Sequence, residues 1–156
     1  MPALDEFLAK VDSAPVLVSA CLLGLSTRYD GGTETHPTLA AFARDHRVVP
    51  VCPEQLGGMP TPRPKSSLAG GDGAAVIKGA AKVLSESGRD VTQNFLRGAT
   101  QTAALVKLTG ARFAVLKEKS PSCGVLKVHI DGRLVDGCGV TTAVLKTLGI
   151  EVFVVP

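Results

Sequence analysis

The stretch Val16-Leu-Val-Ser-Ala-Cys-Leu-Leu-Gly24 leads from a short apolar run into a cysteine and then into a glycine that permits a turn. Residues 16–20 are mostly apolar and include β-branched side chains, a composition typical of a strand buried on both faces of a parallel sheet. Cys21 would then lie at the carboxyl end of this strand, where open α/β sheets bind their ligands. The stretch therefore predicts a central strand and a functional site at its end.

Two further apolar runs lead to a cysteine in the same way. One is Arg47-Val-Val-Pro-Val-Cys52, and the other is the segment 112–117, which continues through Glu-Lys-Ser-Pro-Ser into Cys123. Because the carboxyl ends of parallel strands meet at one edge of a sheet, we expect Cys21, Cys52 and Cys123 to form one site. The sequence contains no Cys-x-x-Cys spacing, so neither a thioredoxin-like motif nor a zinc ribbon is indicated.

Length and composition are those of a globular protein with one core. The 156 residues predict a single domain, 1–156, and 45% hydrophobic with 20% charged residues is an ordinary balance. The net charge of +3 is too small to predict nucleic-acid binding, and no apolar stretch approaches the ~20 residues of a membrane span. The start of the chain carries acidic residues where a secretory signal would be basic, so we expect a cytoplasmic protein. We also expect the protein to be a monomer.

The rest of the chain alternates helical periodicity with short apolar runs, as α/β proteins do. Helices are expected at 4–11, from Pro37 onward, at 90–110 and at 140–148, and further strands at 125–130, 133–135 and 151–155. Asp131-Gly132 is a strong hairpin signal between two of these strands. We predict a three-layer α/β/α sandwich with a mostly parallel, Rossmann-like sheet and a small hairpin.

Residues 53–73 differ in composition from the rest of the chain, because they contain four Pro and five Gly. Such a segment predicts neither regular helix nor central strand but a long, stiff loop that forms a wall or lid of the site. After it, residues 75–78 and 82–84, joined through Gly79, are expected to form a small hairpin.

Three thiolates at one sheet edge suit a soft metal centre, which can be zinc, copper(I) or an iron–sulfur cluster. The alternatives are that the cysteines are ordinary buried residues, that zinc uses Cys138 as a fourth ligand in a non-catalytic module, or that one cysteine is an enzymatic nucleophile. No partnering His is evident for a nucleophile, and Cys138, in Gly137-Cys-Gly139, is more simply explained as a buried residue.

A series of motifs, from about Pro15 to the C-terminus, resembles the thiouracil desulfurase family. The motifs are Ser19-Ala-Cys-Leu-Leu-Gly24, Arg28-Tyr-Asp-Gly31, Val51-Cys-Pro-Glu54, Leu56-Gly-Gly58, Pro60-Thr-Pro-Arg63, Asp90-Val-Thr92 and Ser120-Pro-Ser-Cys-Gly124. The resemblance implies that Cys21, Cys52 and Cys123 hold a 4Fe-4S cluster whose fourth iron takes the sulfur of a thiolated pyrimidine. It also implies a hydrolytic, non-redox exchange of C=S for C=O with release of sulfide. Lys65-Ser-Ser-Leu68 departs from the family pattern, in which an acidic residue is expected there.

The chemistry that the resemblance implies needs a base beside the attacking water and hydrogen-bond donors around the substrate. Glu54 is the candidate base, with the alternative that it only pairs with an arginine. Ser120 is the second catalytic candidate, as a donor to sulfide or a substrate oxygen, with local turn bonding as the alternative. The substrate-binding candidates are Arg28, Asp30, Lys117 and Ser122.

Three of the last group have a simpler interpretation as well. Asp30, which is also the reserve candidate for the base, lies in a sequence typical of a turn. Lys117, which could offset the charge of a cluster, could also be solvated, and Ser122 could serve only local turn bonding. The expected partner is a small thiolated nucleobase or nucleoside. The basic residues do not alternate with aromatics, so no platform for single-stranded RNA is predicted.

Overall fold

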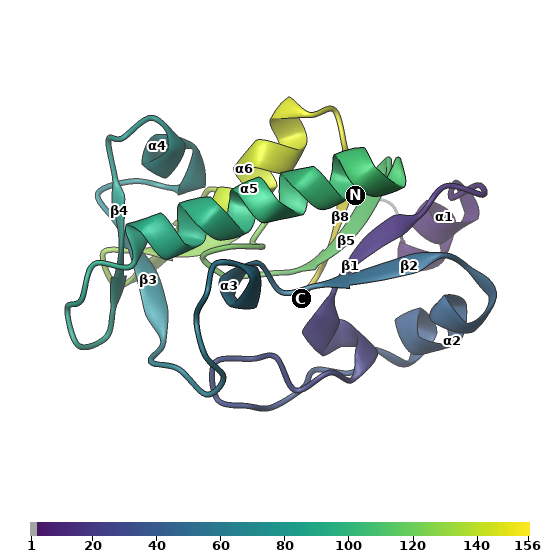
Figure 1. The fold of residues 1–156 in the computed structure, drawn as a ribbon, viewed down its shortest axis with the longest axis horizontal. Helices are drawn as coiled ribbons and strands as arrows, with labels where there is room; N and C mark the ends of the chain where they lie inside the picture. The colour runs from purple at the N-terminus through teal and green to yellow at the C-terminus, as the bar shows by residue number, and fades with distance from the viewer. Residues whose placement is uncertain (1–2) are drawn as a thin grey trace.

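Four apolar strands form the parallel sheet that the sequence predicts. The computed structural model describes residues 3–156, and Figure 1 shows the arrangement of its elements. The strands are β1 (Val16–Ser19), β2 (Val48–Val51), β5 (Phe113–Lys117) and β8 (Glu151–Val155), in the order β2-β1-β5-β8. All three neighbouring pairs are parallel, so their carboxyl ends share one edge.

Helices cover both faces of this sheet. Successive residues of β1 point to opposite faces, so its apolar side chains pack against helices on both sides. Val16 and Val18 pack with Phe7 of α1 (Leu4–Ala9) and Leu39 of α2 (Pro37–Asp45). Leu17, between them, packs with residues of α5 (Thr92–Thr109) and α6 (Val140–Thr147). The predicted α/β/α class is therefore confirmed. None of the helices in residues 3–156 combines the length and apolar character needed to cross a membrane.

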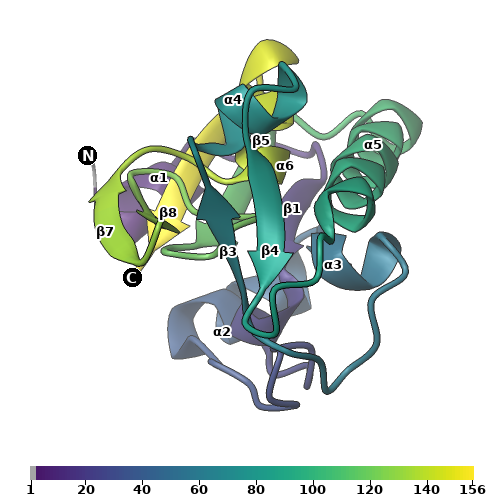
Figure 2. The ribbon, with the colours of Figure 1, turned by 90° about the vertical axis from the view of Figure 1, so that its left-hand side faces the viewer.

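A second, mixed sheet lies at the other end of the molecule, where β3 and β4 face the viewer in Figure 2. Its strands are β3 (Ser66–Ala69), β4 (Lys82–Ser85), β6 (Lys127–Ile130) and β7 (Arg133–Asp136), in the order β4-β3-β6-β7. The predicted hairpin is the β6–β7 pair, and its turn residues Asp131 and Gly132 have φ of 50° and 79°. Positive φ at both positions suits the right-handed twist of a two-residue hairpin.

Two predictions for the middle of the chain are wrong. Residues 53–73 do not form one long loop: they include α3 (Pro53–Leu56) and β3, which lies inside the second sheet. The segment's Pro and Gly lie around these elements, since Pro53 is the first residue of α3, where its missing N–H costs nothing, and β3 itself contains neither residue type.

The expected hairpin of 75–78 with 82–84 is also absent. Residues 73–77 form the short helix α4 (Gly73–Ile77), because Asp72 caps it by accepting the N–H groups of Ala74 and Ala75. β4 pairs antiparallel with β3 instead.

Glycines let α3 pack directly against the N-terminal half of α5. A Cβ on Gly98 would lie 2.0 Å from the carbonyl oxygen of Pro53, and a Cβ on Gly57 would lie 2.0 Å from that of Asn94. Neither position has room for a side chain. The short helix that follows Cys52 is thereby fixed against the longest helix of the protein.

Candidate functional site

A cavity of about 590 Å³ opens at the carboxyl ends of β1, β2 and β5, and all three predicted cysteines line it. Cys21 lies in the 3-10 turn η1 (Ala20–Leu23) that follows β1, and Cys52 lies between β2 and α3. Cys123 lies in the loop between β5 and β6. Strand ends that are far apart in the sequence therefore bring three thiols to one site.

The three thiols interact electrostatically. Burial raises the pKa of the Cys21 thiol, and the neighbouring Cys52 thiolate raises this pKa further. Burial likewise raises the pKa of Cys123, whose thiolate is also disfavoured by Cys52 and Cys21, while a hydrogen bond with Ser19 favours it. Thiolates that disfavour one another are stabilised by a cation or cationic cluster, so the chemistry of this donor set suits a soft metal centre. Within residues 3–156, no three His, Cys, Asp or Glu side chains are grouped as a single metal ion requires.

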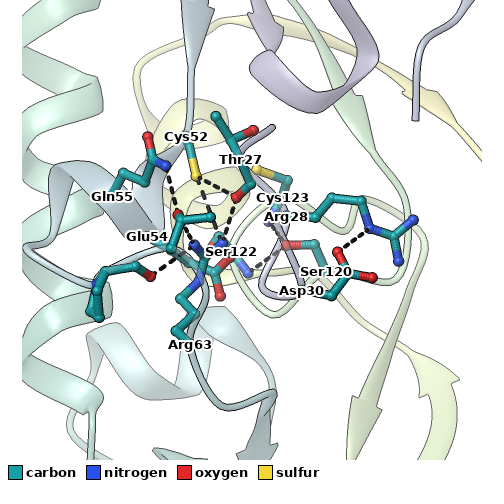
Figure 3. A network of polar contacts seen from close by, with 12 residues as sticks. Thr27, Arg28, Asp30, Cys52, Glu54, Gln55, Arg63, Ser120, Ser122 and Cys123 are labelled. Atoms are coloured by element: carbon teal, nitrogen blue, oxygen red, sulfur yellow. Dashed lines mark hydrogen bonds and ion pairs between the residues drawn. The ribbon is translucent and has the colours of Figure 1, made fainter. Parts of the chain in front are cut away.

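Arg63 links several parts of the site and was given no role from the sequence. Its Nη2 donates to the carbonyl oxygen of Thr27 at 2.9 Å and to Glu54 Oε2 at 2.8 Å, and it approaches Cys52 Sγ at 3.9 Å. Its Nη1 donates to Thr61 Oγ1 at 2.9 Å. Figure 3 shows Arg63 beneath Cys52 and Glu54. Glu54 therefore forms the arginine pair that the sequence left open as an alternative, while still lining the cavity.

We expect Arg63→Leu to lower the free energy of unfolding by about 3 kcal/mol, because its side chain is 1% exposed and its loss leaves Glu54 without a counter-charge. Denaturant unfolding of the metal-free protein measures this change. The matched control is Arg112→Leu, which breaks an exposed ion pair with Asp12 and should leave the unfolding midpoint nearly unchanged. Equal effects of the two substitutions would show that Arg63 does not brace the site.

The predicted substrate-binding residues Lys117 and Arg28 both line the cavity, and both are paired with Glu34. Lys117 Nζ lies 3.0 Å from Glu34 Oε2. Glu34 also lines the cavity and was missed, because nothing in its local sequence marks it. Asp30 is not among the lining residues: it accepts the N–H of Gly32 at 2.9 Å, as its turn interpretation requires, and lies 3.7 Å from Arg28 Nε.

The two serines before Cys123 behave differently. Ser120 Oγ accepts the N–H groups of Ser122 and Cys123, each at 3.1 Å, so local turn bonding is present, and Ser120 also lines the cavity. Ser122 Oγ is buried without a hydrogen-bond partner in the described part of the chain, and Ser122 is not a lining residue. Its substrate-binding role stays a prediction.

Cys138 lies apart from the other three cysteines. Its thiol donates to Asp72 Oδ2 at 3.6 Å, and Asp72 caps α4, so this contact joins α4 to the start of α6. Cys138 does not line the cavity and supplies no fourth thiolate there. His129, to which the sequence assigned no role, does line the cavity, together with Ser66 at the start of β3 and Lys65 just before it.

The fold and the site define a class of protein: a Rossmann-like α/β protein with three strand-end thiols around one cavity. Residues 16–155 match the 2-thiouracil desulfurase family, and the chain belongs to it, which confirms the predicted family. The chain is 39% identical over 140 residues to the uncharacterized protein YbbK of Bacillus subtilis (strain 168), covering 88% of this chain and 93% of that protein.

One solved structure is similar over almost the whole chain. It is the 4Fe-4S-dependent thiouracil desulfidase TudS, with 41% sequence identity, a TM-score of 0.77 and coverage of 90% of both chains. The parallel sheet and its surrounding helices are thus a fold that this family shares.

Proposed function

We propose that the protein is an iron–sulfur-dependent desulfurase that converts the C=S group of a thiolated pyrimidine to C=O and releases sulfide. The observation that carries this proposal is the convergence of Cys21, Cys52 and Cys123 on one cavity. Family membership and the similarity to TudS support the same conclusion.

Cys21, Cys52 and Cys123 would hold a 4Fe-4S cluster, with Arg63 near Cys52 Sγ offsetting part of its negative charge. When bound, such a cluster supplies an iron without a protein ligand, a Lewis acid that can take the substrate's sulfur. Cys138 is held by Asp72 between α4 and α6, so the rival zinc module with four thiolates has less support.

Glu54 is positioned to act as the base for water. Its Oε2 receives the hydrogen bond of Arg63, whereas Oε1 has no hydrogen bond within residues 3–156 and can accept a proton. Because the Ser120 oxygen accepts two backbone N–H groups, its own hydroxyl proton remains free to donate to a substrate sulfur or oxygen.

Arg28 and Lys117, held by Glu34, would orient the polar groups of a small thiolated nucleobase or nucleoside. Water supplies the oxygen of the product and the two protons of hydrogen sulfide, so the balanced reaction needs no electron donor. Residues 1–156 would form one domain that works as a cytoplasmic monomer.

The decisive experiment is anaerobic reconstitution with iron and sulfide, followed by an assay of sulfide release from a panel of thiopyrimidines with and without dithionite. We expect broad charge-transfer absorption, about four irons per chain as the 4Fe-4S cluster requires, and turnover without dithionite. Protein that takes up only zinc would contradict the cluster. Turnover that depends on dithionite would contradict the hydrolytic exchange.

A further inference from the structure

The loop that carries Cys123 has no regular secondary structure of its own. It leaves β5 after Lys117 and returns to β6 at Lys127. Within it Lys119 has a φ of 67°, a left-handed backbone conformation that non-glycine residues rarely adopt. Contacts with other groups must therefore stabilise this loop conformation.

The Glu118 side chain closes this loop at its base. Glu118 Oε1 accepts the N–H groups of Val125 at 2.8 Å, Leu126 at 3.2 Å and Lys127 at 3.3 Å. The same oxygen accepts the N–H of Lys119 at 3.2 Å, and Oε2 lies 3.3 Å from the Leu126 nitrogen. One carboxylate thereby joins both ends of the segment that contains Cys123.

Glu118 is only 8% exposed and forms no ion pair within residues 3–156. A buried carboxylate without a cation is costly unless hydrogen bonds compensate it, and here backbone N–H groups do so. Glu118 also borders the cavity, but its oxygens are committed to the backbone. This commitment distinguishes it from Glu54, which keeps one oxygen free.

The opposite side of the loop is tied to α6. The N–H groups of Thr141 and Thr142 donate to the carbonyl oxygen of Ser122, and the N–H of Gly139 donates to that of Gly124. Cys123 is thus placed between two anchors, the start of α6 on one side and the Glu118 carboxylate on the other. Of these two anchors, only Glu118 depends on a side chain. Within the loop, the Ser120 hydroxyl also accepts the N–H of Cys123, at 3.1 Å.

We propose that Glu118 is a positioning residue that fixes the Cys123 thiol in the geometry that the three-cysteine site needs. This inference rests on the proposed function insofar as the thiol is there to hold a cluster. Replacing the carboxylate by an amide weakens the acceptor and turns an NH2 group toward backbone donors. Replacing it by alanine removes the acceptor altogether, so the effects should be graded.

The first test uses the reconstituted holoprotein and measures the rate at which a chelator removes iron. Relative to the wild type, Glu118→Gln should lose iron about tenfold faster and Glu118→Ala faster still, the size of effect seen for groups that orient metal ligands. The matched control is Asp72→Asn, which also removes a carboxylate that accepts backbone N–H groups, those of Ala74, Ala75 and Cys138, but away from the cavity. It should lose iron at the wild-type rate.

The second test needs no cluster, so it separates this inference from the proposed function. In the metal-free full-length protein, alkylation of Cys123 and Cys138 is followed by mass spectrometry. Glu118→Gln should speed alkylation of Cys123 about tenfold while Cys138 is unchanged, and Asp72→Asn should do the reverse. The reason is that Glu118 closes the loop that carries Cys123, whereas Asp72 accepts the N–H and the thiol of Cys138 directly.

Equal acceleration of both thiols in Glu118→Gln would mean that Glu118 only stabilises the whole fold, and no acceleration would mean that it does not hold the loop. Either result overturns the inference. If Cys123 alone responds and yet the wild-type protein takes up no iron, Glu118 is a positioning residue and the proposed function is what fails.

Discussion

Single replacement of Cys21, Cys52 or Cys123 by alanine is expected to leave the reconstituted protein without iron and without charge-transfer absorption. Each cysteine supplies one of three thiolates from a separate strand end, and two thiolates cannot retain a cluster that already has an iron without a protein ligand. Iron, sulfide and zinc analysis of anaerobically reconstituted variants measures the effect, with desulfuration as a second readout.

Cys138→Ala is the matched control for this series. Its thiol is buried and bonded to Asp72 between α4 and α6, so the replacement removes a packing contact but no group of the cavity. The variant should retain the wild-type iron content, absorption and turnover. Loss of iron from Cys138→Ala would instead indicate a site with four thiolates and would contradict the three-ligand proposal.

The shared position of the three cysteines could be predicted because it depends on simple features of the chain. Each predicted strand is a short apolar run, parallel strands end at one edge, and each cysteine follows such a run directly or after a short loop. The structure places Cys21, Cys52 and Cys123 on one cavity at that edge.

The place of β3 in the second sheet could not be predicted in the same way. β3 is only four residues long and lies in a segment whose average composition is that of a loop. Its pairing with β6 rests on one registered pair, Leu68 with Ile130, which no local pattern reveals. Ser66, and Lys65 just before it, therefore reach the cavity at the start of a strand that sequence periodicity does not indicate.

Arg63 and Glu118 were missed for a related reason: several partners of Arg63 and all hydrogen-bond partners of the Glu118 carboxylate within residues 3–156 are backbone groups. Arg63 contacts a carbonyl oxygen 36 residues away in the sequence, and Glu118 accepts N–H groups from residues seven to nine positions further along the chain. Because almost any residue supplies a backbone N–H and a carbonyl group, these backbone contacts cannot be recognised from a sequence pattern. Arg63 ends one of the quoted motifs and Glu118 lies just before another, but their roles require the folded loops.

Glu54→Gln is expected to leave the iron content unchanged and to slow desulfuration by about 10²–10⁴-fold, the usual contribution of a positioned general base. The amide retains the size of the carboxylate and can still accept a hydrogen bond from Arg63, so the shape of α3 and the position of Cys52 should persist. What it loses is the ability to take a proton from water. Initial rates of sulfide release, measured without reductant on variants with equal iron content, give this factor.

Glu151→Gln is the control for this substitution, because Glu151 is an exposed acid that pairs with Lys10 at the start of β8, away from the cavity. It should turn over at the wild-type rate. If Glu54→Gln keeps its iron and also keeps its rate, the base is another group, and Glu54 serves only to hold Arg63 beside Cys52. If it loses iron, the Glu54–Arg63 pair is needed to build the site, and the proton-transfer role has to be tested by the pH dependence of the rate at full cluster occupancy instead.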